Sequence, residues 1–404
     1  AFLYLLKTFT KMNKNSISFK IKHLVQMFKS TILCILILLS CDNKHQHTTF
    51  DITKHIECSL EDCIEEYAIY PLKSDIPINQ IEFGMAFDSL SFYKSSNSKE
   101  IYYFVNNEYI SKLASIGRGP GEYMNINNYT YNPYNNTIVI SSENEKFHIY
   151  SLPDMNLVRT VNRDGFVKGM YPLSDSTILT VNHCDEKFQY GCGIYTVNIN
   201  NGYSTLIKEI PYMNSFWFSG NEFTQTDSSI LIPVSGCPNR IIEYKNNIIS
   251  DLATITFNNN NIPKEIYAKE ISTIDEKMNF TNFFLENDYK IGCFYPIITD
   301  SLTTLWHMSK TNNLDQYMML AYNNSSYINF SFHIPGINRR IIPDYVANGY
   351  YVLIIQEPID YLIDTSESLS KLGKEIIDTM KKQNNNNPIL LYFKIKPSIL
   401  NELP

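Results

Sequence analysis

Residues 133–151 read PYNNTIVISSENEKFHIYS and contain the pattern that decides the fold. A turn, PYNN, precedes an apolar strand, TIVIS, which a polar tip separates from a second strand, KFHIYS. β-Branched and aromatic residues fit a pleated strand, and Asn and Pro favour the turns between strands. The stretch therefore predicts two short strands that follow a tight turn.

The same order of elements recurs along the chain. The turns LSDS (173–176) and QTDS (225–228) repeat the first one, at an interval of roughly 40 to 50 residues that four-stranded propeller blades produce. Counting by this interval predicts six units, at about 81–118, 126–162, 168–210, 218–257, 280–332 and 344–396. A β-sandwich with a small second domain is the alternative. It accounts for the strand content but not for the recurring order.

Helical spacing is confined to the C-terminal part of the chain. Residues 366–383 place five apolar side chains on one helix face, namely Leu369, Leu372, Ile376, Ile377 and Met380. This segment lies between the strands YYVLIIQ (350–356) and PILLYFKIK (388–396). We therefore predict an all-β, six-bladed β-propeller with a C-terminal helical insertion in the last blade. The helix either packs on the rim or docks a partner.

The ring needs a joint between its first and last blades. The segment EYAIYPLK (66–73) is rich in strand-forming residues and has no blade of its own. We expect it to pair in the sheet formed by residues 344–396, although about 300 residues separate the two segments. Such a pairing would form late in folding and hold the ring together cooperatively.

The N-terminal region has the features of a targeting segment. The apolar run TILCILILL (31–39) is too short to span a bilayer, follows several lysines and ends at Leu38-Leu39-Ser40-Cys41. This end resembles a bacterial lipobox, which implies a lipid on Cys41. We interpret residues 1–40 as a signal peptide with any upstream extension, in which Met12 and Met27 are candidate initiators. Residues 41–65 are then the lipidated Cys and a tether, and residues 66–404 the propeller.

Composition and motifs exclude several functions. A net charge of −7 and a pI near 5.7 argue against a nucleic-acid partner, since phosphate contacts need an excess of Lys and Arg. The sequence has no H-E-x-x-H, G-x-S-x-G, P-loop or C-x-x-C motif. We therefore assign no catalytic residue, no metal site and no cofactor.

Scattered residues give weaker site predictions. Cys184 and Cys192 flank a hairpin-like tip, DEKFQYG, and are close enough in sequence to bridge two strands. Cys58 and Cys63 can pair only if their segment is not helical throughout, because five residues place them about 140° apart on a helix. His183 and Trp217 are candidate ligand contacts, with burial in the core as the alternative for each.

The most distinctive string is SIGRGPGEY (115–123). It resembles a motif of the six-bladed β-propeller lipoproteins of Bacteroidetes, the TolB-like or 6-bladed β-propeller family, in which it ends the first blade. The lipobox and the C-terminal NPILLYFKIK fit the same family, which has no agreed activity. The motif is either a structural loop or a nest of backbone N–H groups that binds an anion. Its residues are Gly117, Arg118, Gly119, Pro120, Gly121, Glu122 and Tyr123.

These features predict a lipid-anchored protein of the cell envelope, held at the outer membrane and facing the periplasm or the surface. Its propeller would bind a glycan, a peptide or a partner protein of the envelope without catalysis. The alternatives are a hydrolase or lyase acting on an extracellular polymer at the central channel, and a scaffold in an envelope complex. Three or more converging carboxylates or histidines at the channel mouth would favour the enzyme, and an aromatic, neutral mouth would favour binding.

Overall fold

The computed structural model forms two units, Ala1–Gln46 and His47–Pro404, and the second contains the propeller. The structure describes residues 46–50, 55–78, 80–142, 145–163, 167–182, 193–210, 223–226, 228–234, 239–257, 291–311, 314–323, 326–383 and 387–402. Cys41 and the rest of the predicted signal peptide lie outside these residues. Within them, no helix has the length and apolar character needed to cross a bilayer.

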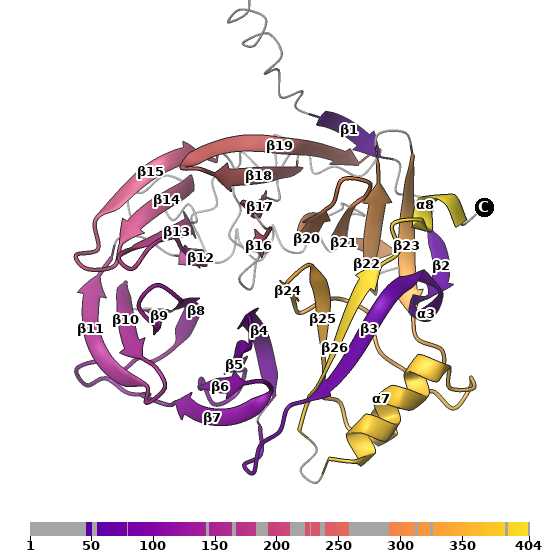
Figure 1. Cartoon of the computed structure of the whole chain (residues 1–404), viewed down its shortest axis with the longest axis horizontal. Coiled ribbons are helices and arrows are strands. Elements are labelled where there is room, and N and C mark those ends of the chain that lie inside the picture. Colours follow the sequence, from indigo (N-terminus) through magenta and orange to yellow (C-terminus); the bar gives the residue numbers. More distant parts are fainter. Residues whose placement is uncertain are drawn as a thin grey trace, which may run out of the picture. The chain divides into compact units, whose positions relative to one another are not determined.

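The described strands form six blades of four or five strands, arranged in a ring (Figure 1). Each of the first three blades is one continuous stretch of chain. Blade 1 contains β4 (Ile81–Phe87), β5 (Leu90–Ser95), β6 (Ile101–Val105) and β7 (Glu108–Leu113). Blade 2 contains β8 (Ile126–Asn132), β9 (Thr137–Ser142), β10 (Lys146–Ser151) and β11 (Asn156–Asn162). Blade 3 contains β12 (Val167–Pro172), β13 (Thr177–Asn182), β14 (Gly193–Asn198) and β15 (Ser204–Glu209).

Each of the other three blades gains a strand from the N-terminal region. Blade 4 contains β16 (Thr224–Gln225), β17 (Ile230–Val234), β18 (Asn239–Lys245) and β19 (Ile248–Phe257). Blade 5 contains β20 (Ile291–Ile298), β21 (Thr303–Thr311), β22 (Leu314–Tyr322) and β23 (Tyr327–His333). Blade 6 contains β24 (Tyr345–Ala347), β25 (Tyr350–Ile355) and β26 (Ile389–Ile395). The predicted fold class is confirmed.

Residues 46–71, which we call the strap, supply those added strands. β1 (Gln46–Phe50) lies beside β19, and β2 (Ile56–Ser59) pairs in parallel with β23. A single helical turn, α3 (Leu60–Cys63), leads into β3 (Ile64–Pro71), which pairs antiparallel with β26. The expected joint between 66–73 and the last blade is therefore confirmed. The predicted tether differs from the structure, because most of 46–63 is built into two blades and a helical turn.

Aromatic side chains fill the interfaces between neighbouring blades. Between blades 1 and 2, the rings of Phe92 and Tyr131 stack with centroids 5.2 Å apart, and those of Phe83 and Tyr129 lie 4.8 Å apart. The buried Tyr129 hydroxyl donates to the Phe92 carbonyl at 2.9 Å. Large rings bury much apolar area, and the hydroxyl of a buried tyrosine needs such a partner. This pairing explains the tyrosine-rich composition.

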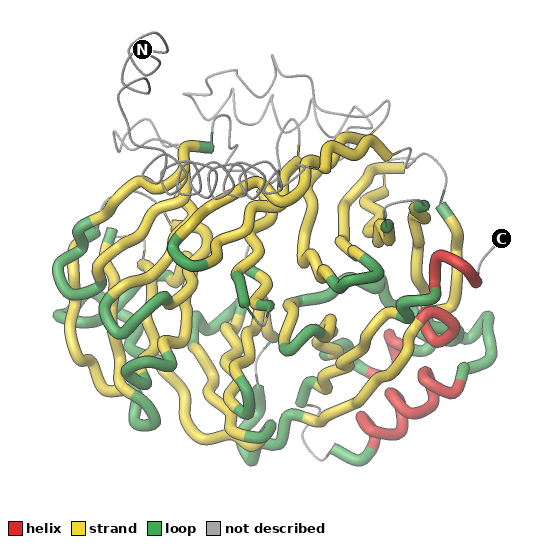
Figure 2. Tube along the Cα trace, turned by 45° about the horizontal axis from the view of Figure 1, so that its top comes forward, coloured by secondary structure: helices red, strands yellow, loops and turns green. Residues whose placement is uncertain are grey.

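The C-terminal helices lie on the outer side of the ring, next to blades 5 and 6 (Figure 2). α6 (Ile359–Leu362) and α7 (Lys371–Lys381) interrupt the blade between β25 and β26, and α8 (Ile399–Glu402) follows it. The Ser370 hydroxyl caps α7 by accepting from the Gly373 N–H at 3.1 Å. The buried face of α7, with Leu372, Ile376 and Ile377 in it, packs in the same core cluster as β26. The helix thus packs on the rim.

Candidate functional site

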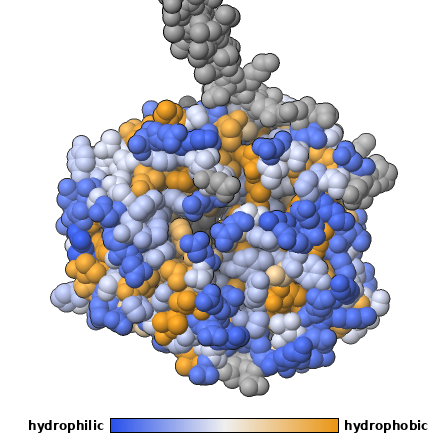
Figure 3. Space-filling view, in the orientation of Figure 1, coloured by the Kyte–Doolittle hydropathy of each residue, from blue (hydrophilic) through white to orange (hydrophobic). Residues whose placement is uncertain are grey.

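The channel mouth is a hollow to which all six blades contribute. Each blade contributes the end of its innermost strand, with residues of the following turn in every blade except blade 3, and together they border a cavity of about 950 Å³. The contributing segments lie in 86–90, 131–134, 171–172, 224–226, 297–299 and 346–349. Figure 3 views one face of the propeller, on which mostly hydrophilic and intermediate residues surround the centre of the ring. The turns PYNN and QTDS, whose spacing helped to indicate the blades, supply residues to this lining, and LSDS directly follows the lining residues Tyr171 and Pro172.

Hydrogen bonds between neighbouring turns hold part of the mouth in place. The Asn132 side-chain amide donates to the Ser174 carbonyl at 2.8 Å, and that of Asn135 donates to the Asp175 carbonyl at 2.7 Å. These bonds join the turn of blade 2 to the turn of blade 3. Asn136 sits at φ +51°, in the left-handed region that Asn tolerates better than most residues. The Asn-rich turns therefore fix the geometry of the mouth.

The mouth is aromatic and carries few charges. Phe87 lies edge-on to Tyr131 with ring centroids 5.5 Å apart, and 6.3 Å from the Tyr171 ring. Tyr134 also lines the mouth and keeps 61% of its surface exposed. The charged residues in the described lining are Glu65, Asp88 and Lys394, and there is no histidine in it. No group of three metal-ligating side chains occurs in the described part of the chain.

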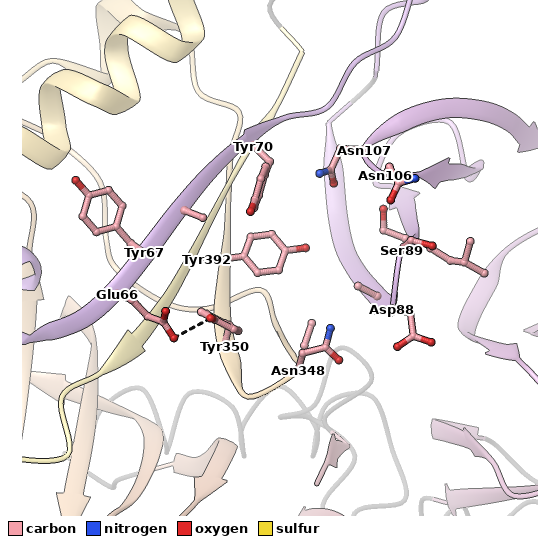
Figure 4. Close-up of a pocket in the computed structure, with 15 residues that line it drawn as sticks. Glu66, Tyr67, Tyr70, Asp88, Ser89, Asn106, Asn107, Asn348, Tyr350 and Tyr392 are labelled. Carbon is pink, nitrogen blue, oxygen red and sulfur yellow. Dashed lines mark hydrogen bonds between the residues drawn. The ribbon is translucent and has the colours of Figure 1, made fainter. Parts of the chain in front are cut away.

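A second hollow, which we call the seam groove, lies where blade 6 meets blade 1 (Figure 4). It has a volume of about 430 Å³ and shares Asp88, Ser89 and Asn348 with the channel mouth. The two hollows are therefore neighbours with a common wall of turn residues. The seam groove runs outward from that wall between the first and last blades.

The two sides of the seam groove differ in chemistry. Blade 6 supplies four tyrosines, and three of them cluster: the Tyr392 ring centroid lies 5.6 Å from that of Tyr70 and 6.3 Å from that of Tyr350. Blade 1 supplies the turn residues Asp88 and Ser89 and the turn Asn106–Asn107. An aromatic wall thus faces a wall of amide, hydroxyl and carboxylate groups.

The cation beside the seam groove is already paired. The Lys394 ammonium lies 2.8 Å from a Glu66 carboxylate oxygen and 4.1 Å from the centre of the Tyr350 ring. The Tyr350 hydroxyl donates to the same carboxylate at 2.8 Å. The hydrogen bonds from Lys394 and Tyr350 lower the pKa of Glu66 below its usual range. This triad leaves Asp88 as the remaining charged group of the groove's described lining.

Tyrosine hydroxyls connect the groove to the core of the seam. The Tyr392 and Tyr345 hydroxyls lie 3.4 Å apart, and those of Tyr345 and Tyr93 lie 3.1 Å apart. Tyr345 and Tyr93 are almost fully buried, and they come from blades 6 and 1. Gly84 makes room for them, because a Cβ there would lie 2.7 Å from the Tyr93 ring. The row of hydroxyls orients Tyr392 at the floor of the groove.

The loop of the GRGPGEY motif links blade 1 to blade 2. The Glu122 carboxylate folds back into it and accepts from the Gly119 N–H at 2.7 Å. A Cβ at Gly117 would meet that carboxylate at 2.0 Å, and Gly121 has φ +80°. The chain's own carboxylate therefore takes the position at Gly119 that an external anion would need. Tyr123 is fully buried and donates to the Lys99 carbonyl at 3.2 Å.

A further hollow of about 710 Å³ borders this loop, with Arg118, Pro120, Lys146 and His148 in its lining. His148 is 2% exposed, and its ring nitrogens lie 3.2 Å from the hydroxyls of Ser142 and Thr160. Burial lowers the pKa of His148, which favours the neutral ring. Neither this histidine nor the hollow was predicted from the sequence. The roles proposed for the motif remain predictions.

The remaining sequence-predicted site residues cannot be compared with the structure. Cys41, His183, Cys184, Cys192 and Trp217 all lie outside the described residues. The lipid anchor, the hairpin disulfide and the two ligand contacts therefore stay predictions. The residues that do line the hollows, Tyr70, Tyr134, Tyr350 and Tyr392 among them, were not singled out from the sequence. The recurring turns were the signal that pointed to the mouth.

Six blades around a turn-lined channel define the class of this protein as a six-bladed β-propeller. The chain belongs to the DUF5128 family, a family of 6-bladed beta-propellers whose model matches residues 40–341. No protein among those with curated descriptions matches the sequence.

Two solved structures from Bacteroides are similar to this chain. A "Putative exported protein" of Bacteroides fragilis NCTC 9343 matches with a TM-score of 0.67 and 14% identity, over 87% of this chain and 100% of that one. A member of the DUF4221 family from Bacteroides vulgatus has a TM-score of 0.49 and 10% identity, over 82% of this chain and 97% of that one. At 14% identity, the likeness to the first of these structures concerns the fold alone.

Proposed function

We propose that the propeller is a binding domain whose channel mouth and seam groove take a neutral, hydroxyl-rich chain such as a glycan. The observation that carries this proposal is the seam groove, in which three tyrosine rings face a wall of Asn, Ser and Asp side chains. Aromatic faces pack against the C–H surface of a sugar ring, and amide and carboxylate groups hydrogen-bond its hydroxyls.

The volumes and charges support this type of ligand. A groove of about 430 Å³ suits a small ligand or one end of a chain, and the adjoining mouth has space for more units. Lys394 and Glu66 neutralise each other, so a neutral ligand meets no buried unpaired charge in the described lining. The described lining of the mouth has two carboxylates and no histidine, whereas an enzyme was expected to have three or more such groups there.

A glycan array probed with the purified chain tests the proposal. We expect a hit whose affinity falls at least about tenfold, or 1.4 kcal/mol, when Tyr70→Ala removes part of the aromatic wall. Asn107→Ala should weaken the same hit by removing a hydrogen-bonding side chain from the opposite wall. Tyr203→Ala is the matched control, because Tyr203 is 71% exposed and lies outside both linings.

Two results would contradict the proposal. One is an array without hits, together with peptides that bind the same face. The other is a loss of affinity as large in Tyr203→Ala as in Tyr70→Ala. Release of shortened glycan products during incubation would instead support the hydrolase or lyase alternative.

We also propose that a lipid on Cys41 holds the protein at the cell envelope, as an outer-membrane lipoprotein. The supporting observation is the string LLSC after a short apolar run. Cys41→Ser should move the protein from the membrane fraction to the soluble fraction and abolish labelling by a fatty-acid probe. Cys34→Ser, within the apolar run, is the control that should leave both unchanged. Unchanged membrane association of Cys41→Ser would refute the anchor.

A further inference from the structure

The strap turns a corner between blades 5 and 6, and two cysteines meet there. Cys58 lies on β2, opposite Phe332 of blade 5, and Cys63 ends the single turn of α3. One residue later, Ile64 begins β3 and pairs with Ile395 of blade 6. The two sulfur atoms lie 3.0 Å apart, in contact across the corner.

The backbone on both sides holds this contact in place. The Cys63 carbonyl accepts from the Lys396 N–H at 3.0 Å, and the Lys396 ammonium donates to the Asp62 carbonyl at 2.8 Å. Cys63 is 2% exposed, and Cys58, half-buried, packs against the same core cluster. The parallel pairing of β2 fixes Cys58 independently. The meeting of the thiols therefore follows from the fold and not from a mobile side chain.

We propose that Cys58 and Cys63 form a disulfide that closes the corner of the strap. A small rotation of the two side chains brings the sulfurs from contact to the bonded distance of about 2.05 Å. The segment is helical for one turn only and begins as a strand, which removes the 140° separation that a continuous helix would impose.

The oxidation needs a disulfide as oxidant, either a small-molecule disulfide or a thiol–disulfide oxidoreductase. The Cys58 thiolate, the more exposed of the two, attacks the oxidant's S–S bond and releases one thiol. The Cys63 thiolate then attacks the Cys58 sulfur and releases the second thiol. The two cysteines lose two protons and two electrons, and the oxidant gains them as two thiols.

The bridge would join strands of two different blades. β2 belongs to blade 5 and β3 to blade 6, so a covalent corner keeps the strap in register with both. The hydrogen bond with Cys63, followed by burial, raises the pKa of the Cys58 thiol. Oxidation should therefore be faster at higher pH, where more thiolate forms.

Tryptic digestion isolates the pair. Cleavage after Lys54 and Lys73 leaves both cysteines, and no other cysteine, in the peptide 55–73. After the native chain is incubated with oxidised glutathione at about pH 8, this peptide should be lighter by two hydrogen atoms without reductant and should regain them with it. The melting temperature of the oxidised chain should fall by a few degrees when reductant is added.

Variants give the test its controls. Cys58→Ala and Cys63→Ala should each abolish both the mass difference and the effect of reductant on melting. Cys58→Ala alone suffices if loss of the buried Cys63 impairs folding. Ser59→Ala lies in the same corner, where the Ser59 side chain makes no capping hydrogen bond, and should retain both effects.

Three outcomes would overturn the proposal. They are a 55–73 peptide that stays reduced, a peptide bridged to a different cysteine, and an oxidised peptide whose reduction leaves the melting temperature unchanged. The last would remove the stabilising role even though the bond forms.

Discussion

Blade 2 and blade 6 have similar four-stranded sheets but are assembled differently. Blade 2 runs without interruption from Ile126 to Asn162, and each strand pairs with the next along the chain. Blade 6 combines β24, β25 and β26 with β3, and the register places Leu391 opposite Ile69. The two sheets thus have the same architecture but differ in the sequence separation of the strands that they pair.

That difference in sequence separation determines which blade the stability of the ring depends on most. The hairpins of blade 2 need only short loops, whereas the pairing of β3 with β26 closes most of the chain. Blade 6 also holds α7 and the row of tyrosine hydroxyls that reaches blade 1. We therefore expect blade 6 to control the cohesion of the propeller, and blade 2 to form early and locally.

Of the changes proposed below, deletion of β26 should destabilise the propeller most. Without residues 389–395, β25 and β3 each lose a partner and present open, apolar edges, so the chain should aggregate and not form a five-bladed remnant. Deletion of 46–50 is the control, because blade 4 keeps four strands without β1. Size-exclusion chromatography would contradict the account if the 389–395 deletion gave a soluble monomer with an unchanged melting temperature.

Core truncations should separate the two blades kinetically. Leu391 in blade 6 and Ile140 in blade 2 are both fully buried, so Leu391→Ala and Ile140→Ala should each cost about 2–5 kcal/mol of unfolding free energy. If blade 6 closes last, Leu391→Ala should mainly accelerate unfolding, and Ile140→Ala should mainly slow refolding. Stopped-flow measurements with denaturant would contradict this order if the two variants changed the same rate.

The pH dependence of stability should be the smallest effect and should have opposite signs in the two blades. In blade 6, burial raises the pKa of Asp344 to about 6, even though Arg339 lies 3.8 Å away. Stability from the protonated carboxyl is present below the unfolded pKa and is lost as pH rises through about 6. In blade 2, burial lowers the pKa of His148, so stability is lost as pH falls through the unfolded pKa of His.

Variants without these groups isolate each contribution. The difference in unfolding free energy between Asp344→Asn and the unchanged chain should favour the variant more at pH 7 than at pH 4. We expect a change of about 1–2 kcal/mol between the two pH values, because a quarter of the Asp344 side chain is exposed and solvent weakens the effect. His148→Gln should show the reverse, with its relative gain larger at pH 5 than at pH 7. Melting curves of the three chains across this range check both signs. Equal offsets at every pH would show that neither group titrates as described.

The contrast between the blades also shows what sequence patterns can predict. The turn PYNN and the strands TIVIS and KFHIYS act over a few residues, and the predicted unit 126–162 coincides with blade 2. β3 was predictable because EYAIYP has strong strand propensity and no local partner. β1 and β2 were missed because QHTTF and IECS are short, without clear alternation, and pair with strands far along the chain.

The candidate site was predictable only in part, for the same reason. The turns at the mouth are visible in the sequence, but only ring closure places the ends of six innermost strands around one cavity. Tyr70 and Asn107 face each other across the seam because β3 joins the last blade. This juxtaposition depends on the pairing of β3 with β26, two segments that lie far apart in the sequence, and no local sequence pattern indicates it.

The strap has a consequence for the order in which the protein is made. Its three strands leave the ribosome before their partners β19, β23 and β26, which follow much later in the sequence. At about 5–20 residues per second, β26 is synthesised roughly 15 to 65 s after β3. Throughout that time β3 has no partner strand to accept it. Folding of the propeller is therefore completed only after β26 has been synthesised, and a chain cut short before β26 would leave β3 exposed to proteases and chaperones.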